Sequence, residues 1–233
     1  GTVLCTSFYW TRQERVCVNY SGIEGSFICA SKVPVHAANL RHVGGHFAAS
    51  TTHRIYLPYL ASVGGNFEAT MSFHVDAPRL RQVGGRVAIA GQLLPSLETV
   101  GGRLVAMWAY QFEAPKLKHV GGTMSLAKTE QLWVPVLETV GGGILLGSLA
   151  KKIDAPKLGS VGGDFLAGMA THIRAPRLRS VGGDLVTNWA EEFYHPAIRV
   201  GGHWEIHPNA LENWTRREAA RLAIRGKGGP FYL

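Results

Sequence analysis

The chain has 233 residues, of which 46% are hydrophobic, and it carries a formal net charge of +8. This length and apolar content suffice for one sizeable core, and the longest apolar runs fall far short of the roughly 20 residues that a membrane-spanning helix needs, so no membrane span is expected. No charged-then-apolar leader is visible at the start of the chain, which leaves the compartment unknown.

Residues 1–22 precede the regular pattern that fills most of the chain. They hold the aromatic run "FYW" and two of the three cysteines, Cys5 and Cys17, with Cys29 at the same spacing beyond them. The three match neither a paired zinc motif nor a Cys-x-x-Cys redox motif, so no metal or other cofactor is expected. We predict that residues 1–22 form an N-terminal cap, because the end of a repeat stack otherwise exposes apolar surface.

Residues 23–207 contain a repeat of about 20 residues, marked by the triplet Val-Gly-Gly, which occurs nine times. A leucine stands three residues before the valine in the first eight copies, and in most copies a proline stands five residues before it. Successive valines are about 20 residues apart, except for one interval of 17. The valines are Val43, Val63, Val83, Val100, Val120, Val140, Val161, Val181 and Val200.

Each repeat holds two or three short strands. After the glycines, variable and apolar residues alternate, as at Phe47 and Ala49, which is the pattern of a β-strand. A second short stretch of the same kind precedes the proline, as in "FHVDAP" and "KIDAP". Because a unit of this size cannot bury its apolar side alone, the copies must stack. The sequence therefore predicts a mainly β fold, a parallel β-solenoid of about ten 20-residue rungs.

The glycine pair and the proline mark corners of each rung. Eighteen of the 29 glycines recur at one place, although a glycine in an extended segment costs about 0.5–1 kcal/mol relative to alanine. That corner must therefore need glycine, either for a sharp bend or for a close backbone approach between rungs. Proline lacks an N–H and fixes φ, so we expect it in a turn where no inter-rung hydrogen bond is donated.

The tandem pattern "LxxVGGxLxA" resembles the leucine-rich repeat superfamily, and more particularly its receptor L-domain type, over about four fifths of the chain. The asparagine that ends the strand motif of ordinary leucine-rich repeats is absent, and no repeat has room for a helix on the convex side. We therefore expect a coil that is straighter than a horseshoe. The resemblance implies recognition of proteins or other macromolecules more often than catalysis.

Residues 208–233 follow the last repeat and have a different pattern. In "ALENWTRREAARLAIRG" the apolar residues Leu211, Trp214, Ala219 and Leu222 recur at helical spacing, and Gly226 ends the run. We predict a C-terminal capping α-helix followed by a short tail.

Stacking converts equivalent positions of the repeats into stripes on the surface. The residues four and two before each valine flank the inward leucine and should both face solvent. They form a predicted basic stripe, opposed in these positions by Glu98 and Glu138. The basic residues are Arg41, Arg79, Arg81, Lys116, Lys118, Lys157, Arg177 and Arg179. Such a stripe is either a solubilising surface or a site for an acidic protein patch, a nucleic acid or an anionic glycan.

Two further sets of residues are candidate sites. Asp164 and Asp184 occupy the position after the glycines in adjacent repeats, where paired carboxylates suit a β-helical carbohydrate-active enzyme, although two surface aspartates explain them as well. Trp108, Tyr110 and Trp189 lie in the irregular segments after the strands, where aromatic residues either pack over the edge of the coil or anchor a partner.

The sequence lacks a phosphate-binding loop, a nucleophile elbow and a dinucleotide fingerprint. We therefore expect a non-catalytic recognition or scaffold module that binds a protein through a lateral surface of the solenoid. A polyanion binder that uses the basic stripe is the first alternative, and the carbohydrate-active enzyme is the second.

Overall fold

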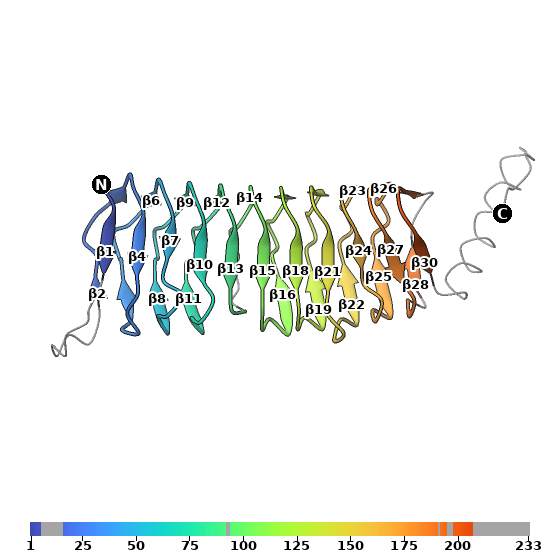
Figure 1. Ribbon diagram of the computed structural model, residues 1–233, viewed down its shortest axis with the longest axis horizontal. Helices are drawn as coiled ribbons and strands as arrows, with labels where there is room; N and C mark the ends of the chain where they lie inside the picture. Colours follow the sequence, from blue (N-terminus) through green and yellow to red (C-terminus); the bar gives the residue numbers. More distant parts are fainter. Residues whose placement is uncertain (6–15, 92–93, 191, 195–197, 207–233) are drawn as a thin grey trace, which may run out of the picture.

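The computed structural model describes residues 1–5, 16–91, 94–190, 192–194 and 198–206. These residues form a straight rod of about nine turns in which every strand pairing is parallel (Figure 1). Strands of two or three residues alternate with tight corners, and the described residues contain no helix. The parallel β-solenoid and its mainly β class are confirmed. The described residues form about nine turns, whereas the sequence predicted about ten.

The strands stack into three faces, each named here by its sheets. Sheet A has eleven strands and contains the residues that follow the glycines. Its strands, in spatial order, are β1 (Val3–Cys5), β4 (Phe27–Cys29), β7 (Phe47–Ala48), β10 (Phe67–Ala69), β13 (Val87–Ile89), β15 (Leu104–Ala106), β18 (Met124–Leu126), β21 (Ile144–Leu146), β24 (Phe165–Leu166), β27 (Leu185–Thr187) and β30 (Trp204–Ile206).

The second face consists of sheets B and D, which contain the residues before the prolines. Sheet B comprises β2 (Val16–Cys17), β5 (Val35–His36), β8 (Arg54–Tyr56) and β11 (His74–Asp76). Sheet D comprises β16 (Gln111–Glu113), β19 (Gln131–Trp133), β22 (Lys152–Asp154), β25 (His172–Arg174) and β28 (Glu192–Tyr194).

Sheet C forms the third face and contains the valines of the triplets. Its ten strands are β3 (Gly22–Ile23), β6 (His42–Val43), β9 (Ser62–Val63), β12 (Gln82–Val83), β14 (Thr99–Val100), β17 (His119–Val120), β20 (Thr139–Val140), β23 (Ser160–Val161), β26 (Ser180–Val181) and β29 (Arg199–Val200).

The break between sheets B and D coincides with the short interval of 17 residues between Val83 and Val100. In this rung the residues equivalent to β16 are 91–93, and residues 92–93 lie outside the described part of the chain. Leu94, which precedes its proline, is buried like Ala77 and Ala114, which precede theirs in the adjacent rungs. Sheets A and C run past this rung without interruption.

Each rung encloses its own apolar core. The first residue of each described sheet A strand from β4 to β27, the leucine after each proline and the valine of each triplet except Val200 are all buried. At the N-terminal end the column in sheet A holds three phenylalanines whose rings stack, with centroids 5.0 Å apart for Phe27 and Phe47 and 5.1 Å apart for Phe47 and Phe67. The core is thus a continuous column of like residues along the rod.

The proline corner is a β-turn, as expected. The N–H of Leu60 donates to the carbonyl of Leu57 at 3.2 Å, which places Pro58 second in the turn, and Leu80 and Ala77 repeat the bond around Pro78. Proline is favoured at that position because its fixed φ matches the turn.

The glycine corner is a place of close approach between backbones. A Cβ on Gly121 would lie 2.1 Å from the carbonyl oxygen of Gly101, the equivalent residue of the preceding rung. No described glycine has φ in the left-handed range, so the corner does not depend on that conformation. Instead the glycine amides continue the ladder, as where Gly65 donates to the carbonyl of Gly45 at 2.8 Å. Of the two explanations for the glycine pair, the structure selects the close approach.

The ends of the chain were expected to cap the rod. Within residues 1–22, the described strands β1 and β2 and the first residue of β3 extend sheets A, B and C in register with the following rung. The predicted helix in residues 208–233 lies outside the described residues. In the described part of the chain, no helix is long and apolar enough to cross a membrane.

Candidate functional site

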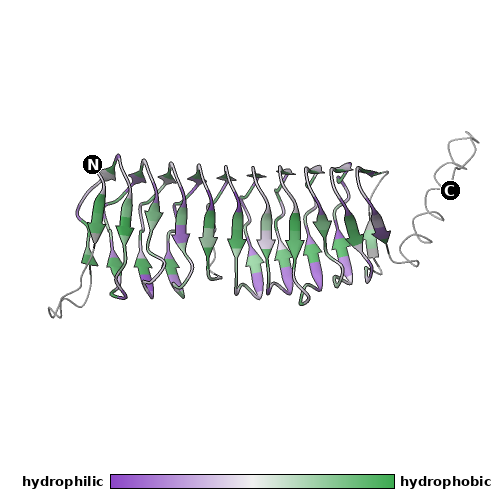
Figure 2. Cartoon of the chain, in the orientation of Figure 1, coloured by the Kyte–Doolittle hydropathy of each residue, from purple (hydrophilic) through white to green (hydrophobic). Residues whose placement is uncertain are grey.

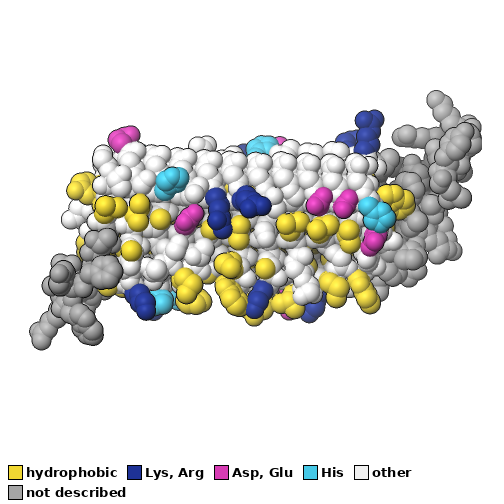
Figure 3. All heavy atoms as spheres, in the orientation of Figure 1, with side chains coloured by type: hydrophobic (Ala, Val, Ile, Leu, Met, Phe, Trp, Pro, Cys, Tyr) yellow, Lys and Arg dark blue, Asp and Glu magenta, His cyan; other side chains and the backbone are white. Residues whose placement is uncertain are grey.

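The outer face of sheet A is apolar along much of its length. The middle residue of each strand points outward because side chains alternate along a strand. In eight of these positions the residue is apolar and is half-buried or more exposed, except for the buried Ala88. We call Leu4, Ile28, Ala48, Ala88, Val105, Leu145, Leu166 and Val186 the outer apolar column; it runs along the rod in Figure 3.

A second row of apolar side chains lies at the corner between sheet A and sheets B and D. The three predicted aromatic residues are there, with exposed fractions of 51% for Trp108, 58% for Tyr110 and 59% for Trp189. More than half of each of these side chains is therefore exposed. The structure adds other exposed apolar residues from the same corner. We call the whole set, Met71, Phe73, Met107, Trp108, Tyr110, Leu149, Met169 and Trp189, the corner ridge.

The ridge follows a positional rule that sequence reasoning missed. Five of its members directly precede a small residue that is buried in the turn, as Trp108 precedes Ala109 and Trp189 precedes Ala190. Lys128 holds the same position one rung after Trp108, and its Nζ lies 3.8 Å from the centroid of the indole ring. Alignment of the repeats on these buried small residues would have revealed the row.

The other two faces present mostly polar side chains. The outward residues of sheets B and D include Arg54, His74, Asp76, Gln111 and Lys152, and their large apolar exceptions are Tyr56 and Trp133. The outward residues of sheet C are histidine, serine, threonine, glutamine and arginine. Figure 2 shows the contrast between the strands by hydropathy. Among the described residues, outward apolar side chains thus concentrate on sheet A and its corner.

A charged column borders the outer apolar column on the side of the glycines. It comprises the residues that directly follow each glycine pair: His46, Asn66, Arg86, Arg103, Thr123, Gly143, Asp164, Asp184 and His203. The basic members lie near the middle of the rod and the two aspartates lie toward its C-terminal end (Figure 3). Arg86, Arg103, Asp164 and Asp184 form no ion pair with another described side chain.

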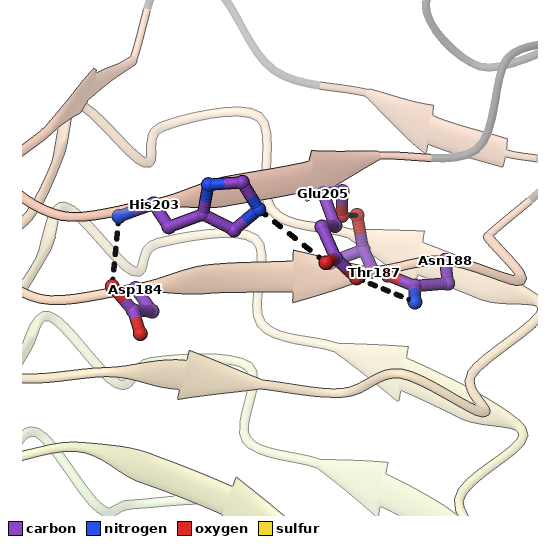
Figure 4. A network of polar contacts seen from close by, with 5 residues as sticks. All are labelled: Asp184, Thr187, Asn188, His203 and Glu205. Atoms are coloured by element: carbon purple, nitrogen blue, oxygen red, sulfur yellow. Dashed lines mark hydrogen bonds and ion pairs between the residues drawn. The ribbon is translucent and has the colours of Figure 1, made fainter.

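Several residues of this column bind the backbone of the next rung. The Oδ1 atom of Asp164 accepts the N–H of Asp184 at 2.9 Å, and that of Asp184 accepts the N–H of His203 at 2.8 Å (Figure 4). Asn66 accepts the N–H of Arg86 in the same way. The aspartates therefore have a structural task, which is to satisfy an amide at the glycine corner.

The predicted pair of aspartates is adjacent, but its surroundings do not form a catalytic constellation. The imidazole of His203 points to Glu205, with Nε2 3.3 Å from Oε1, and Asn188 donates to the other oxygen of Glu205 at 2.8 Å (Figure 4). His203 thus contacts Asp184 only through its backbone N–H in this network. No group of three or more His, Cys, Asp or Glu residues that could hold a metal ion occurs in the described part of the chain.

The eight residues of the predicted basic stripe are all exposed, at the proline corner between sheets B and D and sheet C. The stripe is interrupted by Glu98, which pairs with Lys118 at 3.7 Å, and by Glu138. Toward the N-terminal end, a hollow is lined by Arg41, Arg79 and Arg81 together with Tyr59, Ala61 and Ser96. The small side chain of Ala61 leaves the space between the arginines. The guanidinium of Arg79 lies 4.7 Å from the centroid of the Tyr59 ring.

A second, shallow groove crosses the outer side of sheet C. Its floor is the backbone of consecutive first glycines from Gly44 to Gly121, and one margin holds His42, Ser62, Gln82 and His119. The N–H of each of these glycines donates to the carbonyl of the residue before the equivalent position of the preceding rung, as Gly64 donates to the carbonyl of Val43 at 2.8 Å. The groove therefore follows from the close approach of the backbones at this corner.

Comparisons with known proteins give no relative. No protein-family model matches the sequence, and neither a curated protein nor a solved structure matches it at a significant level. The parallel β-solenoid is compatible with a solenoid repeat superfamily. Arguments about function therefore rest on the surface itself.

Proposed function

We propose that this protein is a non-catalytic recognition or scaffold module that binds protein through sheet A and its corner ridge. The observation that carries the proposal is the alignment of exposed tryptophan, tyrosine and methionine side chains on one corner of the rod, next to the outer apolar column. A contiguous apolar surface on a folded protein marks an interaction site more often than scattered apolar residues do. Tryptophan and tyrosine are also enriched among the residues that dominate binding energy.

The scaffold suits this task because it holds the side chains rigidly. The strands from which the outer apolar column projects are hydrogen-bonded on both sides over most of sheet A. A partner that binds them orders little additional backbone, which lowers the entropic cost of association. We also propose that the rungs are of the receptor L-domain type of leucine-rich repeat, since the leucine, valine and glycine pair of "LxxVGGxLxA" take the inward and corner positions that such a pattern needs.

Substitution of two ridge tryptophans tests the proposal. We expect Trp108→Glu with Trp189→Glu to abolish capture of the physiological protein partner, because each buried tryptophan of a central contact contributes about 2 kcal/mol or more. The measurement is quantitative affinity capture from cell extract, followed by titration of each captured protein against the purified chain.

Trp133→Glu is the matched control, because Trp133 is also an exposed tryptophan but projects from sheet D. A partner that binds the ridge is retained by this variant. If captured proteins survive the double substitution, or if the control loses them equally, binding does not use the corner ridge and the proposal is wrong.

A polyanion binder is the second candidate, favoured by the hollow between Arg41, Arg79 and Arg81. Three guanidinium groups around one depression suit a phosphate, sulfate or carboxylate group of a polymer. The stripe continues at Lys116 and Lys118, beyond the interruption at Glu98.

A further inference from the structure

We propose that the apolar face of sheet A is covered by a second copy of this chain, arranged with the two rods antiparallel. This inference rests on the proposed function, since it names the protein that binds there. It is argued from the order of charges along the column that borders the outer apolar column.

The charges of the column are complementary under a two-fold axis. In sheet A the strands β13, β15, β18, β21, β24 and β27 follow one another without interruption. The residues before β13 and β15 are Arg86 and Arg103, and those before β24 and β27 are Asp164 and Asp184. A two-fold axis that runs along the strands between β18 and β21 places β13 opposite β27 and β15 opposite β24. Each arginine then faces an aspartate of the other copy, four times in the dimer.

The residues at the two-fold axis are small enough for close contact between the two copies. The column holds Thr123 before β18 and Gly143 before β21, the smallest pair in this part of the column. Because this axis reverses the rod but keeps the strand direction, each column also faces itself. The outer apolar column of one copy therefore packs against the outer apolar column of the other, with Val105 opposite Leu166 and Ala88 opposite Val186, as a self-complementary interface requires.

Other arrangements of the two faces are worse. If the two-fold axis runs along the rod, the rods are parallel. An axis through the middle of sheet A then places the charged column of one copy against the corner ridge of the other. An axis along the charged column instead sets each arginine opposite the same arginine of the other copy. The first option buries charge against apolar side chains, and the second opposes like charges.

The antiparallel pair has one kind of like-charge contact, Glu68 of β10 opposite Glu205 of β30, which occurs twice in the dimer, once at each outer limit of the contact. Both carboxylates have partners within their own chain. Asn66 donates to Glu68 at 3.4 Å, and Asn188 and His203 contact Glu205. The rim of an interface stays accessible to solvent, where a pair of charges contributes little.

The contact is large enough for a specific dimer. The eight strands from β10 to β30 span about 34 Å, since neighbouring strands lie roughly 4.8 Å apart. A width of about 15 Å from the charged column to the ridge gives roughly 500 Å² in plan for each copy, near the lower limit of specific interfaces. Because the rod is straight, the sheet A faces of the two copies can meet along this length (Figure 1).

Charge exchange tests the pairing in solution. Light scattering of the full chain is expected to give twice the chain mass of 25.2 kDa, in a concentration-dependent manner. Arg86→Asp with Arg103→Asp opposes like charges at four positions, so we expect the dissociation constant to rise roughly 100-fold. A chain with Asp164→Arg and Asp184→Arg is expected to dissociate equally, and a mixture of the two variants is expected to form a 1:1 heterodimer, because every facing pair is then complementary.

Stability is controlled separately, since arginine cannot accept the backbone N–H that each aspartate binds. Asp164→Asn with Asp184→Asn keeps an acceptor and removes only the charge, so this variant should fold as the wild type does and dimerise more weakly. Circular dichroism verifies the fold of each variant. Leu166→Lys is expected to abolish the dimer, whereas Gln131→Lys, on sheet D, leaves it intact.

Two results would overturn the inference. A wild-type chain that stays at its monomer mass up to its solubility limit has no self-pairing, although the ridge can still bind another protein. A dimer that resists both the arginine substitutions and Leu166→Lys uses a different surface. Loss of partner capture in the ridge variants is an independent readout, so a failure of self-pairing and a failure of the proposed function can be distinguished.

Discussion

At the scale of single residues, the most constrained positions are the first glycines of the triplets. Each sits against the carbonyl of its equivalent in the preceding rung, where a methyl group has no space, as at Gly121. Because the contact is between backbones, a side-chain rearrangement cannot relieve it. These glycines lie at the surface, but they are therefore as sensitive to substitution as core residues.

We predict that Gly121→Ala lowers the free energy of unfolding by about 2–4 kcal/mol, in the range of severe steric substitutions. The Cβ of alanine would lie 2.1 Å from the Gly101 oxygen and would force the rungs apart. Gly159→Ala is the control, since its Cβ would meet only the Glu138 oxygen at 3.6 Å. Urea denaturation monitored by circular dichroism measures both, and equal stabilities would contradict the steric explanation.

The residue after each glycine pair illustrates what the sequence can and cannot predict about a single residue. The column that contains Asp164 and Asp184 was predicted correctly from the spacing alone. Its structural role was not predicted, because whether a carboxylate faces a neighbouring amide depends on the geometry of the glycine corner. The amide of the next rung donates to the side chains of His46, Asn66, Asp164 and Asp184 alike, and the spacing of the repeats does not encode that contact.

At the scale of elements, no strand in the described part of the chain is longer than three residues, so stability comes from the columns that neighbouring rungs form. The inward position that opens each sheet A strand illustrates this. It holds Phe27, Phe47 and Phe67 at one end, and valine, leucine, methionine, isoleucine or a further phenylalanine, Phe165, along the rest of the rod. A change at one rung is therefore felt mainly by the rungs directly above and below it.

We predict that Phe47→Ala destabilises the protein by about 3–5 kcal/mol, because the ring is fully buried between two stacked rings. Phe47→Leu should cost clearly less, since the column accepts leucine at Leu104 and Leu185. Thermal unfolding of the two variants provides the comparison. Similar losses for both would mean that ring stacking, and not the filled volume, determines stability here.

Some strands and turns could be predicted from the sequence, and others could not. The sheet A strands, the strands before the prolines and the proline turn followed from the repeat pattern, because the same alternation recurs in copy after copy. The sheet C strands at the valines were not specified. The split between sheets B and D did not follow from the pattern either, although the interval of 17 residues before Val100 was plain in the sequence. A count of residues shows that this rung is shorter, but it does not show where the ladder of sheet B ends and that of sheet D begins. The predicted helix of residues 208–233 remains a prediction.

At the scale of the whole molecule, the rod presents three faces of different character. Sheet A is apolar with a charged margin, sheets B and D are polar, and the edge of sheet C bears the basic stripe. The net charge of +8 adds a long-range attraction for acidic partners. The three surfaces are separated by corners, so one can be altered without the others.

We predict that any binding to heparin or to nucleic acid falls steeply with salt and is lost when Arg79, Arg81, Lys116 and Lys118 are all changed to glutamate, because release of counterions drives such binding. Fluorescence anisotropy at increasing salt measures it. Glutamate at Lys152, Arg174 and Arg54 on the second face is the control. Binding that survives the first set and not the control would assign the polyanion site to sheets B and D.

The short rung also has a consequence for how the chain finds its own register. Near-identical repeats can pair one copy out of step during folding, since a slipped neighbour offers almost the same side chains. The rung around Leu94 is shorter than the others, because 17 residues separate Val83 and Val100 whereas the other intervals are 19 to 21 residues. A slip across it would set a short rung beside positions that belong to a longer one, so this single irregularity distinguishes the rungs next to it from the other copies.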